Sequence, residues 1–421
     1  MHPCGRMCQG LGPRVKDRPK ISFIILWRLN DWGFYKRRHE ALARELSSRE
    51  EVERVVHVEY VSFKGLLYQV FLWFKERDRS LRKVYGEHIK KGISLKPAAA
   101  DKSGKLFIYS VVLFYTGRNS LLISLNESIL RLQYEAVNKS FKHSKSSKVL
   151  LLYPPSEYFP DVMHNISHDI LIADLVDDDI SRAADESEKS RLRENYKEIL
   201  PNCRWIFSTS PIFNDVYKEY AKQRIDYIPN GVDMGDFIPL PGKTAFPRNG
   251  KKAVGYAGVI NREADMDLLE YAVSHNTNAD FLIVGYATDE RLEDIRRLTN
   301  EYANFHYLGP KNHKEMSAFM KNCDVLINLK KNDHTTSGGE SIKTYEYLAT
   351  GKPIVSTPVP PADRFTDVMY VTSDKLEFSG FLNKALDEND ESLHDRRRSI
   401  AANNSWDQRV DVILDKVSQL L

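Results

Sequence analysis

The stretch GGESIKTYEYLATGKPIVST, residues 338–357, decides the fold of this chain. Its two leading glycines permit backbone angles that are closed to other residues, and the residues after them predict a helix followed by a buried strand. The first turn of a helix carries unpaired N–H groups and the positive end of the helix dipole, and both attract a diphosphate. We therefore predict an anion site where this helix begins.

Two charged residues of the same helix indicate the rest of the ligand. Lys343 and Glu346 are three positions apart, so their side chains project from neighbouring points of one helix face. A lysine can neutralise phosphate charge, and a carboxylate can accept two hydrogen bonds from the hydroxyls of a ribose. The stretch therefore predicts a clamp for a nucleotide sugar.

The stretch and its surroundings resemble the retaining glycosyltransferases of family 4, also called glycosyl transferases group 1. Further segments occur in that family's order: YIPNGVDMGDF (227–237), VGYAGVINREADMDLL (254–269), FLIVG (281–285), HYLG (306–309) and DVLIN (324–328). The segments DWGFYKRRHEALAREL (31–46) and ADLVDD (173–178) are similar to bacterial cell-surface polysaccharide enzymes of the teichuronic-acid type. The resemblance implies the GT-B fold, in which two Rossmann-like doubly wound domains face each other across a cleft.

Alternating strand and helix patterns predict an α/β chain of two domains. A disordered leader is expected at residues 1–19, an acceptor-binding domain at 20–235, a Pro- and Gly-rich linker at 236–252 and a nucleotide-sugar-binding domain at 253–403. In GT-B proteins the last helix, here 404–421, often crosses back to the first domain. Ligands of doubly wound sheets lie at the carboxyl ends of the strands, so one cleft between the domains is predicted.

Hydrophobic patterns place the individual elements. Strands are predicted at 21–27, 54–60, 106–114, 148–153, 170–175, 205–209, 253–258, 281–284, 305–308, 325–329 and 353–356. Helices are predicted at 35–47, 121–141, 186–200, 212–221, 265–274, 290–301, 314–322 and 341–350. The longest apolar runs, 66–74 and 106–115, are shorter than the ~20 residues that span a bilayer, so they are core elements, interface elements or membrane-surface anchors.

The resemblance assigns donor binding and catalysis to the second domain. It implies that Arg262, four residues past Gly258, reaches the diphosphate, where positive donors stabilise the leaving group. The family commonly has a lysine a few residues after this arginine, but Glu263, Asp265 and Asp267 follow here. This leaves Lys343, with Lys330 as a further candidate, for the role of the second cation. The expected catalytic residues are Arg262, Lys343 and Glu340, and the expected donor-binding residues are Gly258, Gly285, Thr335, Thr336, Ser337, Gly338, Gly339, Ser341, Ile342 and Glu346.

One departure from the family pattern concerns the transferred sugar. The family has a second glutamate eight positions before the one that Glu346 matches, and Gly338 stands at that position here. Glu340 is the nearest substitute. The alternative role for Glu340 is that of a carboxylate that stabilises the positive end of the helix dipole.

The acceptor side is expected in the first domain, on residues that follow its strands. These residues are Asn30, Asp31, Gly33, Arg38, His39, Asp177 and Asp178. For His39 the alternative is an ordinary surface or capping histidine. Asp177 and Asp179 also allow a rival hypothesis, the Asp-x-Asp metal motif of single-domain GT-A enzymes, although the clamp in the second domain argues against it.

Composition narrows the class of protein. The chain has 421 residues, of which 42% are hydrophobic and 28% charged, as in a soluble globular protein. Residues 61–148 contain 17 Lys and Arg but 6 Asp and Glu, which suits an acidic acceptor or an anionic membrane, or else a plain solvated surface. Cys203 and Cys323 are expected to be packed thiols of a cytoplasmic protein, and Cys4 and Cys8 lack the second ligand pair of a zinc site. No Gly-x-Gly-x-x-Gly opens a helix after the first strand of either domain, which argues against a nicotinamide dehydrogenase.

These observations together predict a metal-independent, retaining enzyme of hexosyltransferase type. It would move a sugar from a UDP- or GDP-linked donor to a glycan or lipid-linked acceptor in cell-surface polysaccharide biosynthesis. We expect no further cofactor, no nucleic-acid partner, and a cytoplasmic location with peripheral contact to the inner face of an anionic membrane. Two alternatives stay open: a GT-B nucleotide-sugar epimerase, which needs no acceptor, and a non-catalytic sugar-nucleotide-binding subunit of a synthase complex.

Overall fold

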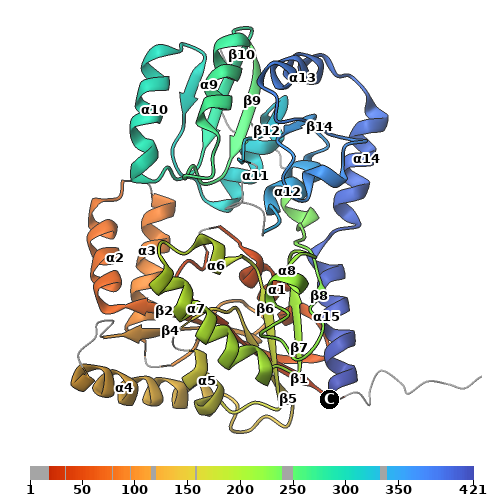
Figure 1. Ribbon diagram of the computed structural model, residues 1–421. Helices are drawn as coiled ribbons and strands as arrows, with labels where there is room; N and C mark the ends of the chain where they lie inside the picture. Colours follow the sequence, from red (N-terminus) through yellow and green to blue (C-terminus); the bar gives the residue numbers. More distant parts are fainter. Residues whose placement is uncertain are drawn as a thin grey trace, which may run out of the picture.

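The computed structural model describes residues 19–33, 35–77, 79–94, 96–114, 120–156, 159–238, 250–331 and 339–421. It has two α/β domains, and the second lies above the first in Figure 1. Apart from Pro19, the predicted leader lies outside the described residues, as do residues 239–249 of the predicted linker. The prediction of an α/β chain with two Rossmann-like domains is confirmed.

An eight-stranded sheet, in the order β3-β4-β2-β1-β5-β6-β7-β8, forms the centre of the first domain. All its pairings are parallel except that of β3 with β4, as expected for strands joined by helices. The strands are β1 (Ile21–Trp27), β2 (Val52–Ser62), β3 (Ala98–Ala99), β4 (Leu106–Leu113), β5 (Ser147–Leu152), β6 (Ile170–Leu175), β7 (Trp205–Ser208) and β8 (Asp226–Tyr227). Every residue of β1 and of β6 is buried, because both strands lie inside the sheet with helices over both faces.

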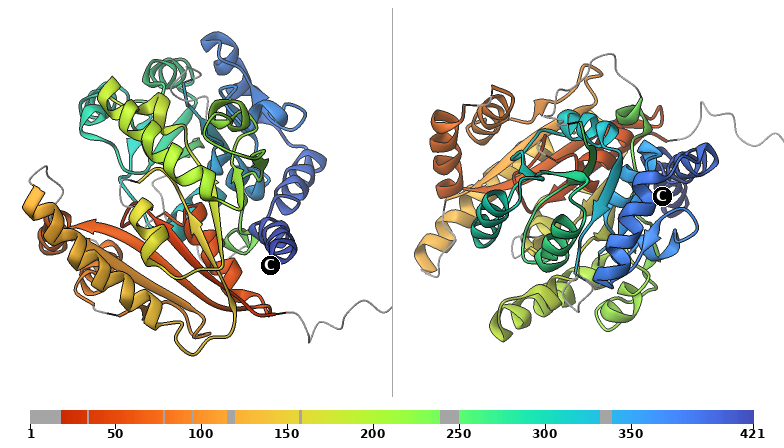
Figure 2. Two further views of the ribbon diagram at one scale, coloured as in Figure 1. Left: turned by 60° about the horizontal axis from the view of Figure 1, so that its bottom comes forward. Right: turned by 90° about the horizontal axis from the view of Figure 1, so that it is seen from above.

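Helices cover both faces of this sheet (Figure 2). They are α1 (Arg38–Ser48), α2 (Phe63–Lys75), α3 (Arg79–Gly92), α4 (Ser120–Lys139), α5 (Phe159–Asn165), α6 (Asp179–Arg182), α7 (Glu186–Ile199) and α8 (Phe213–Tyr217). Side chains of α4, α5, α7 and α8 share one core cluster with alternate residues of the strands, and α1 packs on the opposite face. Each face of the sheet therefore has its own apolar core.

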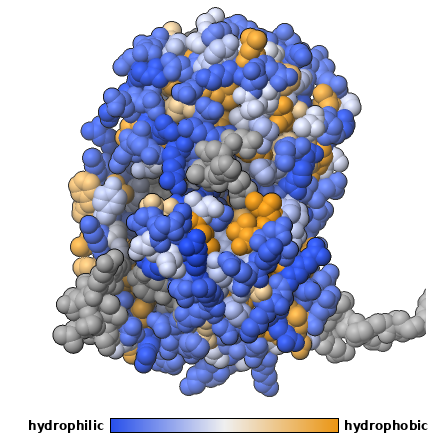
Figure 3. All heavy atoms as spheres, viewed as in Figure 1, coloured by the Kyte–Doolittle hydropathy of each residue, from blue (hydrophilic) through white to orange (hydrophobic). Residues whose placement is uncertain are grey.

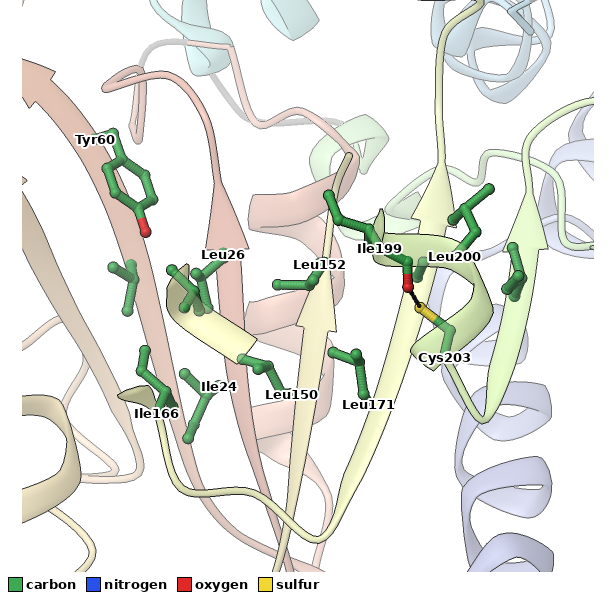
Figure 4. Packing of buried hydrophobic residues seen from close by; sticks show 14 of the residues in the cluster. Ile24, Leu26, Tyr60, Leu150, Leu152, Ile166, Leu171, Ile199, Leu200 and Cys203 are labelled. Atoms are coloured by element: carbon green, nitrogen blue, oxygen red, sulfur yellow. Dashed lines mark hydrogen bonds between the residues drawn. The ribbon is translucent and has the colours of Figure 1, made fainter. Parts of the chain in front are cut away.

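Figure 4 shows part of the core under α5 and α7, where Ile24, Leu150 and Leu171 lie close to the helices. Cys203 is buried in this core, and its thiol donates a hydrogen bond to the carbonyl oxygen of Ile199 at 3.5 Å. Burial raises the pKa of Cys203 to about 12. The prediction of packed thiols is confirmed for Cys203 and Cys323, both of which are free and buried.

Two helices, α2 and α3, lie where no element is predicted. The sequence of α2, FKGLLYQVFLWFK, is apolar at most positions, and a short apolar run of this kind cannot be assigned to a helix or a strand by its pattern alone. A start signal is nevertheless present, because the side chain of Ser62 accepts a hydrogen bond from the backbone N–H of Gly65 and caps the helix. None of the helices in the described ranges is long and apolar enough to cross a membrane.

The second domain contains a six-stranded parallel sheet in the order β11-β10-β9-β12-β13-β14. Its strands are β9 (Lys252–Ala257), β10 (Ala279–Val284), β11 (Phe305–Tyr307), β12 (Val325–Asn328), β13 (Ile354–Ser356) and β14 (Tyr370–Val371). Its helices are α9 (Met266–His275), α10 (Asp289–Glu301), α11 (His313–Asn322), α12 (Ile342–Thr350), α13 (Lys375–Asp387) and α14 (Glu391–Ala402). The predicted strands and helices of this half are confirmed to within a few residues, whereas β14, α13 and α14 were not predicted.

The chain returns to the first domain in its last helix, α15 (Trp406–Leu420). Trp406, Val410 and Ile413 are buried in the same core cluster as α1 and β1 (Figure 1). Just before this helix, the chain runs beside the turn that leaves the first domain, because Val232 exchanges backbone hydrogen bonds with Asn404 and Trp406 at 3.0 and 3.1 Å. Two segments therefore join the domains side by side.

Candidate functional site

The turns after β9 and β10 meet at a pair of glycines. Gly258 and Gly285 have φ angles of 149° and 146°. A Cβ atom on Gly285 would lie 1.8 Å from the carbonyl oxygen of Gly258, so only glycine fits there. A Cβ atom on Gly258 would in turn lie 2.9 Å from Nζ of Lys343. The structure therefore brings both predicted glycines together beside the predicted cation.

The beginning of α12 faces the first domain. Its N-cap residue, Ser341, makes no side-chain capping bond to the helix that starts at Ile342. A Cβ atom on Gly339 would lie 3.0 Å from Oδ1 of Asp177 and 3.3 Å from the carbonyl oxygen of Val176, both in the first domain. The other residues predicted for this turn, Thr335, Thr336, Ser337 and Gly338, lie outside the described residues. The turn before α12 therefore lies against the first domain, next to the carboxylate of Asp177.

Lys343 is a cation in the first turn of α12. Its Nζ donates a hydrogen bond to the hydroxyl of Tyr256 at 2.9 Å and lies 4.4 Å from the centroid of the same ring. Neither contact removes the positive charge, and no carboxylate of the described residues forms an ion pair with this lysine. Tyr256 therefore holds an available charge next to Gly258.

Glu346 lies one turn further along α12, at the junction of the domains. It lines a cavity of about 10 Å³ together with Lys36 of the first domain, His313 and Asp236. Burial raises the pKa of Glu346, and the nearby charge of His313 opposes that shift. Asp236 Oδ2 lies 2.8 Å from Nε2 of His313 and 2.5 Å from Nζ of Lys36. Because this cavity is too small for a pentose, ribose binding at Glu346 requires the domains to move apart.

Glu340, which was predicted to be catalytic, has a different environment. Its carboxylate accepts hydrogen bonds from the hydroxyls of Tyr227 and Tyr345 and forms an ion pair with Arg364. Its backbone carbonyl accepts a further bond from the side chain of Asn230 at 2.9 Å. This carboxylate is buried and fully engaged with the protein. The placement favours a structural role that fixes the turn at Asn230, where the chain leaves the first domain, against α12.

Arg262 and Lys330 lie where the second domain meets α6. Arg262 is exposed, and its Nη2 donates to the carbonyl oxygen of Arg182 at 3.3 Å. Glu263 forms ion pairs with both domains, because its carboxylate lies 3.4 Å from Nζ of Lys330 in the second domain and 3.0 Å from Nη2 of Arg182 in the first. Arg182 also pairs with Asp177 at 2.7 Å. A series of ion pairs thus bridges the domains. Lys330 is paired with Glu263, whereas Arg262 has no carboxylate partner among the described residues.

The loop after β1 carries most of the predicted acceptor residues. Glu59 of β2 accepts hydrogen bonds from the backbone N–H groups of Asp31 and Trp32 at 3.1 and 2.9 Å. Gly33 has a φ of 87°, which explains the glycine at this turn. Within the described part of the chain, the amide of Asn30 has no hydrogen-bond partner although its atoms are buried. Burial raises the pKa of Glu59 to about 8.

His39 lies behind this loop and not on its surface. Its Nδ1 lies 2.8 Å from Nε2 of His57, its Nε2 lies 3.3 Å from Oδ1 of Asp31, and its ring stacks on Trp27 at 4.2 Å. Burial acts to raise the pKa of Asp31, but the hydrogen bond and charge of His39 hold it below its usual value. Because His39 is buried, this geometry favours a role in positioning Asp31 over direct contact with an acceptor.

Arg38, predicted on the acceptor side, is buried inside the first domain. Its side chain is 2% exposed, and its Nε lies 2.6 Å from Oδ2 of the fully buried Asp174. Its Nη1 also donates to the carbonyl oxygen of Pro229 at 2.9 Å. The guanidinium therefore connects α1, β6 and the turn at Asn230, and it does not line the cleft.

The three aspartates after β6 all have partners in the protein. Asp178 caps α6 by accepting from the backbone N–H of Ser181 at 3.2 Å, and Asp179 pairs with Arg28 at 2.7 Å. Asp177, paired with Arg182 as described above, is the one that approaches the turn before α12. This arrangement gives no support to the GT-A metal hypothesis, and metal independence stays a prediction.

Several residues at the site were not predicted. Lys36 and His313 lie beside Glu346, and His57 and Glu59 lie beneath the loop after β1. A signal existed for the last two: they are polar residues at alternate, same-face positions of the Val-rich strand VERVVHVEYVS, where a buried polar side chain needs a partner. Lys36 and His313 meet only because the domains meet.

Comparison with known sequences agrees with this geometry. Residues 251–385 match the model of the family described as glycosyl transferases group 1. TuaH of Bacillus subtilis, a candidate teichuronic acid biosynthesis glycosyltransferase, is 26% identical over 197 residues, which are 44% of this chain and 49% of that protein. This chain therefore matches about half the length of that curated relative. The predicted resemblance to group 1 and to teichuronic-acid-type proteins is confirmed.

Solved structures with the same fold cover nearly the whole chain. Sucrose-phosphate synthase from Thermosynechococcus elongatus has a TM-score of 0.66 at 13% identity and covers 95% of this chain and 99% of its own. An α,α-trehalose-phosphate synthase (UDP-forming) from Burkholderia vietnamiensis has a TM-score of 0.64 at 11% identity, with coverage of 96% and 100%. HepE from Anabaena, solved with UDP and glucose, has a TM-score of 0.61 at 11% identity, with coverage of 94% and 99%. The GT-B fold is thereby confirmed.

Proposed function

We propose that this chain, which has the GT-B fold and a second domain similar to group 1 glycosyltransferases, transfers a sugar from a nucleotide-sugar donor to an acceptor. One observation carries the proposal. Lys343, in the first turn of α12, lies beside the glycine pair Gly258 and Gly285, and the turn before this helix meets the first domain at Gly339. This combination of helix end, ammonium group and bare backbone suits a diphosphate.

The same residues would do most of the chemical work. As the bond between the sugar and the diphosphate breaks, negative charge grows on the departing phosphate. Lys343 and Arg262 supply positive charge there, and the N–H groups at the start of α12 supply hydrogen bonds. The resemblance implies retention of the anomeric configuration, with the acceptor hydroxyl attacking from the face that the diphosphate leaves. The departing phosphate oxygen would then be close enough to accept the proton of that hydroxyl. We expect this step to need no metal.

Domain movement is part of the proposal. The cavity beside Glu346 holds about 10 Å³ and is lined in part by Lys36 of the first domain. A donor would enter while the domains are apart, and closure would then exclude water that could hydrolyse it. The ion pairs of Arg182 with Asp177 and Glu263 would hold the donor-free arrangement, in which the cavity beside Glu346 is too small for a ribose.

For the acceptor, we propose a glycan or lipid-linked glycan of cell-surface polysaccharide biosynthesis. The name of the relative TuaH supports this class, as does the excess of Lys and Arg at residues 61–148. The loop that contains Asn30 and Asp31 would receive it, because this loop follows the carboxyl end of β1 and its buried supports fix its shape.

A thermal-shift panel of UDP-, GDP-, ADP- and dTDP-sugars tests donor binding, since a ligand of the folded state raises its stability. Glu346→Gln should clearly reduce the shift, and Glu293→Gln, at an exposed glutamate of α10, should preserve it. NMR of the product with an added acceptor then reports turnover and anomeric configuration. Donor consumption without an acceptor would favour the epimerase, and binding without turnover would favour a non-catalytic subunit.

A further inference from the structure

The outer face of α2 carries apolar side chains that nothing in the described structure covers. We propose that this face is a docking surface for an anionic lipid bilayer. The proposal stands on α2 and its surroundings and does not depend on the transferase reaction.

The exposed residues form a continuous stripe. Phe63, Leu67 and Phe71 follow each other at intervals of four and continue to Phe74, which places them on one side of the helix. Leu67 and Phe71 are each 55% exposed and Phe74 is 71% exposed, whereas such side chains in a folded domain are normally buried. Figure 3 shows apolar residues along its left edge, where α2 lies in Figure 1.

Two glycines of α3 fix which face of α2 points inward. A Cβ atom on Gly86 would lie 3.2 Å from Nε1 of Trp73, and one on Gly92 would lie 2.6 Å from Leu66. The guanidinium of Arg82 also lies 4.6 Å from the centroid of the Trp73 ring. Because α3 accommodates Leu66 and Trp73 so closely, α2 cannot turn its outer stripe toward the protein.

The apolar surface continues past α2 into a groove. Phe63 stacks on Phe114 with their ring centroids 5.6 Å apart, and both line a groove of about 1300 Å³ that runs between α2, β4 and α4. Ile93 and Leu132, which are 69% and 73% exposed, also line it. A patch of this extent on a folded protein marks an interaction site.

Charge selects the occupant. Exposed Lys64 and Lys75 lie at the two ends of α2, and Lys96 and Lys139 line the groove. Lysines beside an apolar face suit anionic headgroups above hydrocarbon, as in helices that lie at a membrane surface. A second copy of this chain would instead bring the same positive charges against each other. The observations therefore favour an anionic bilayer.

Cosedimentation of the full chain with vesicles tests the proposal. We expect binding to vesicles of equal parts phosphatidylglycerol and phosphatidylcholine, and weaker binding to pure phosphatidylcholine. The triple variant Leu67→Ser, Phe71→Ser, Phe74→Ser should bind at least about tenfold more weakly, since it loses apolar area. The variant Lys64→Glu, Lys75→Glu should also bind more weakly and show less dependence on salt.

The control is Leu376→Ser with Val412→Ser, which alters residues that are 73% and 52% exposed elsewhere and should bind like the wild type. Matching thermal unfolding curves establish that all variants are folded. The proposal is overturned if the wild type does not pellet with phosphatidylglycerol vesicles, if it binds pure phosphatidylcholine equally well, or if the triple variant binds as well as the wild type. It is also overturned if lipid-free ultracentrifugation shows a dimer that the triple variant dissociates.

Discussion

The donor side and the acceptor side of the cleft are built in different ways. On the donor side, the turn before α12, Lys343 and Glu346 come from one short stretch, and two tight glycine turns pack beside them. On the acceptor side, the loop after β1 is held by Glu59, and its Asp31 is held by His39. A local motif can thus supply a donor site, whereas the acceptor site depends on buried ionisable groups contributed by separate elements.

The largest effect should come from removing the buried support of the first domain. Asp174→Ala leaves the guanidinium of Arg38 buried without its partner, which should cost about 3–5 kcal/mol of unfolding free energy. Urea unfolding measures this loss. The exposed Asp415→Ala on α15 is the control and should change stability by less than about 0.5 kcal/mol. Equal effects of the two substitutions would show that the buried pair is unimportant.

The support beneath the acceptor loop should depend on pH. Burial raises the pKa of Glu59 from 4.5 to about 8, although the charge of Lys91 opposes this shift. Between these two pH values the carboxyl group of Glu59 is therefore protonated in the folded state and ionised in the unfolded state. The contribution of Glu59 to stability should therefore be greatest below its unfolded-state pKa of 4.5, and it should be lost as the pH rises through its folded-state pKa of about 8.

Glu59→Gln tests this pH dependence, because glutamine keeps an acceptor oxygen for the loop but does not titrate. Unfolding free energies measured across that pH range should be flatter for this variant than for the wild type, and Glu293→Gln should retain the wild-type slope. A Glu59→Gln protein with an unchanged slope would contradict the account of the loop.

On the donor side, the expected effects concern binding more than stability. Glu346→Gln should weaken nucleotide-sugar binding by about ten- to a hundredfold, since a hydrogen bond to a charged group contributes roughly 1.5–3 kcal/mol. Calorimetric titration measures this change. Unfolding free energy should change little, because Glu346 forms no ion pair with another residue of the described chain. A large loss of stability with intact affinity would reverse the contrast between the two sides.

The smallest effect concerns the ion pairs that join the two sides. Arg182→Ala should change stability by less than about 1 kcal/mol, because the side chain is partly exposed. It should strengthen donor binding by up to about fivefold, since it favours the open form that admits the donor. Lys189→Ala, which breaks an exposed pair within α7, should leave affinity unchanged. Weaker binding in Arg182→Ala would indicate that Arg182 touches the donor itself.

What the sequence could predict follows the same division. Strands and helices alternate regularly from β9 to β13, and each has a clear hydrophobic pattern, so these elements could be predicted. The proximity of Gly258, Gly285 and Lys343 follows from the positions of these elements and could be predicted as well. The burial of Arg38 could not, because a basic residue at a helix start gives no sign that Asp174 lies opposite it.

Glu340 and α2 show two further limits of local patterns. The role of Glu340 is set by Tyr227 and Arg364, which are far from it in sequence, so motif position alone suggested catalysis. The helix α2 is apolar on both its inner and its outer face, so its short apolar run could not be assigned to a helix or a strand from the pattern alone.

The central claim is that the start of α12 and Lys343 bind the diphosphate of the donor. Calorimetric titration of the wild type and Lys343→Met with the nucleoside diphosphate that gives the largest thermal shift, and with its monophosphate, tests it most directly. The variant should lose at least about tenfold in affinity for the diphosphate and much less for the monophosphate, because the lost charge faces the outer phosphate. Unchanged diphosphate affinity in a folded Lys343→Met protein would contradict the claim.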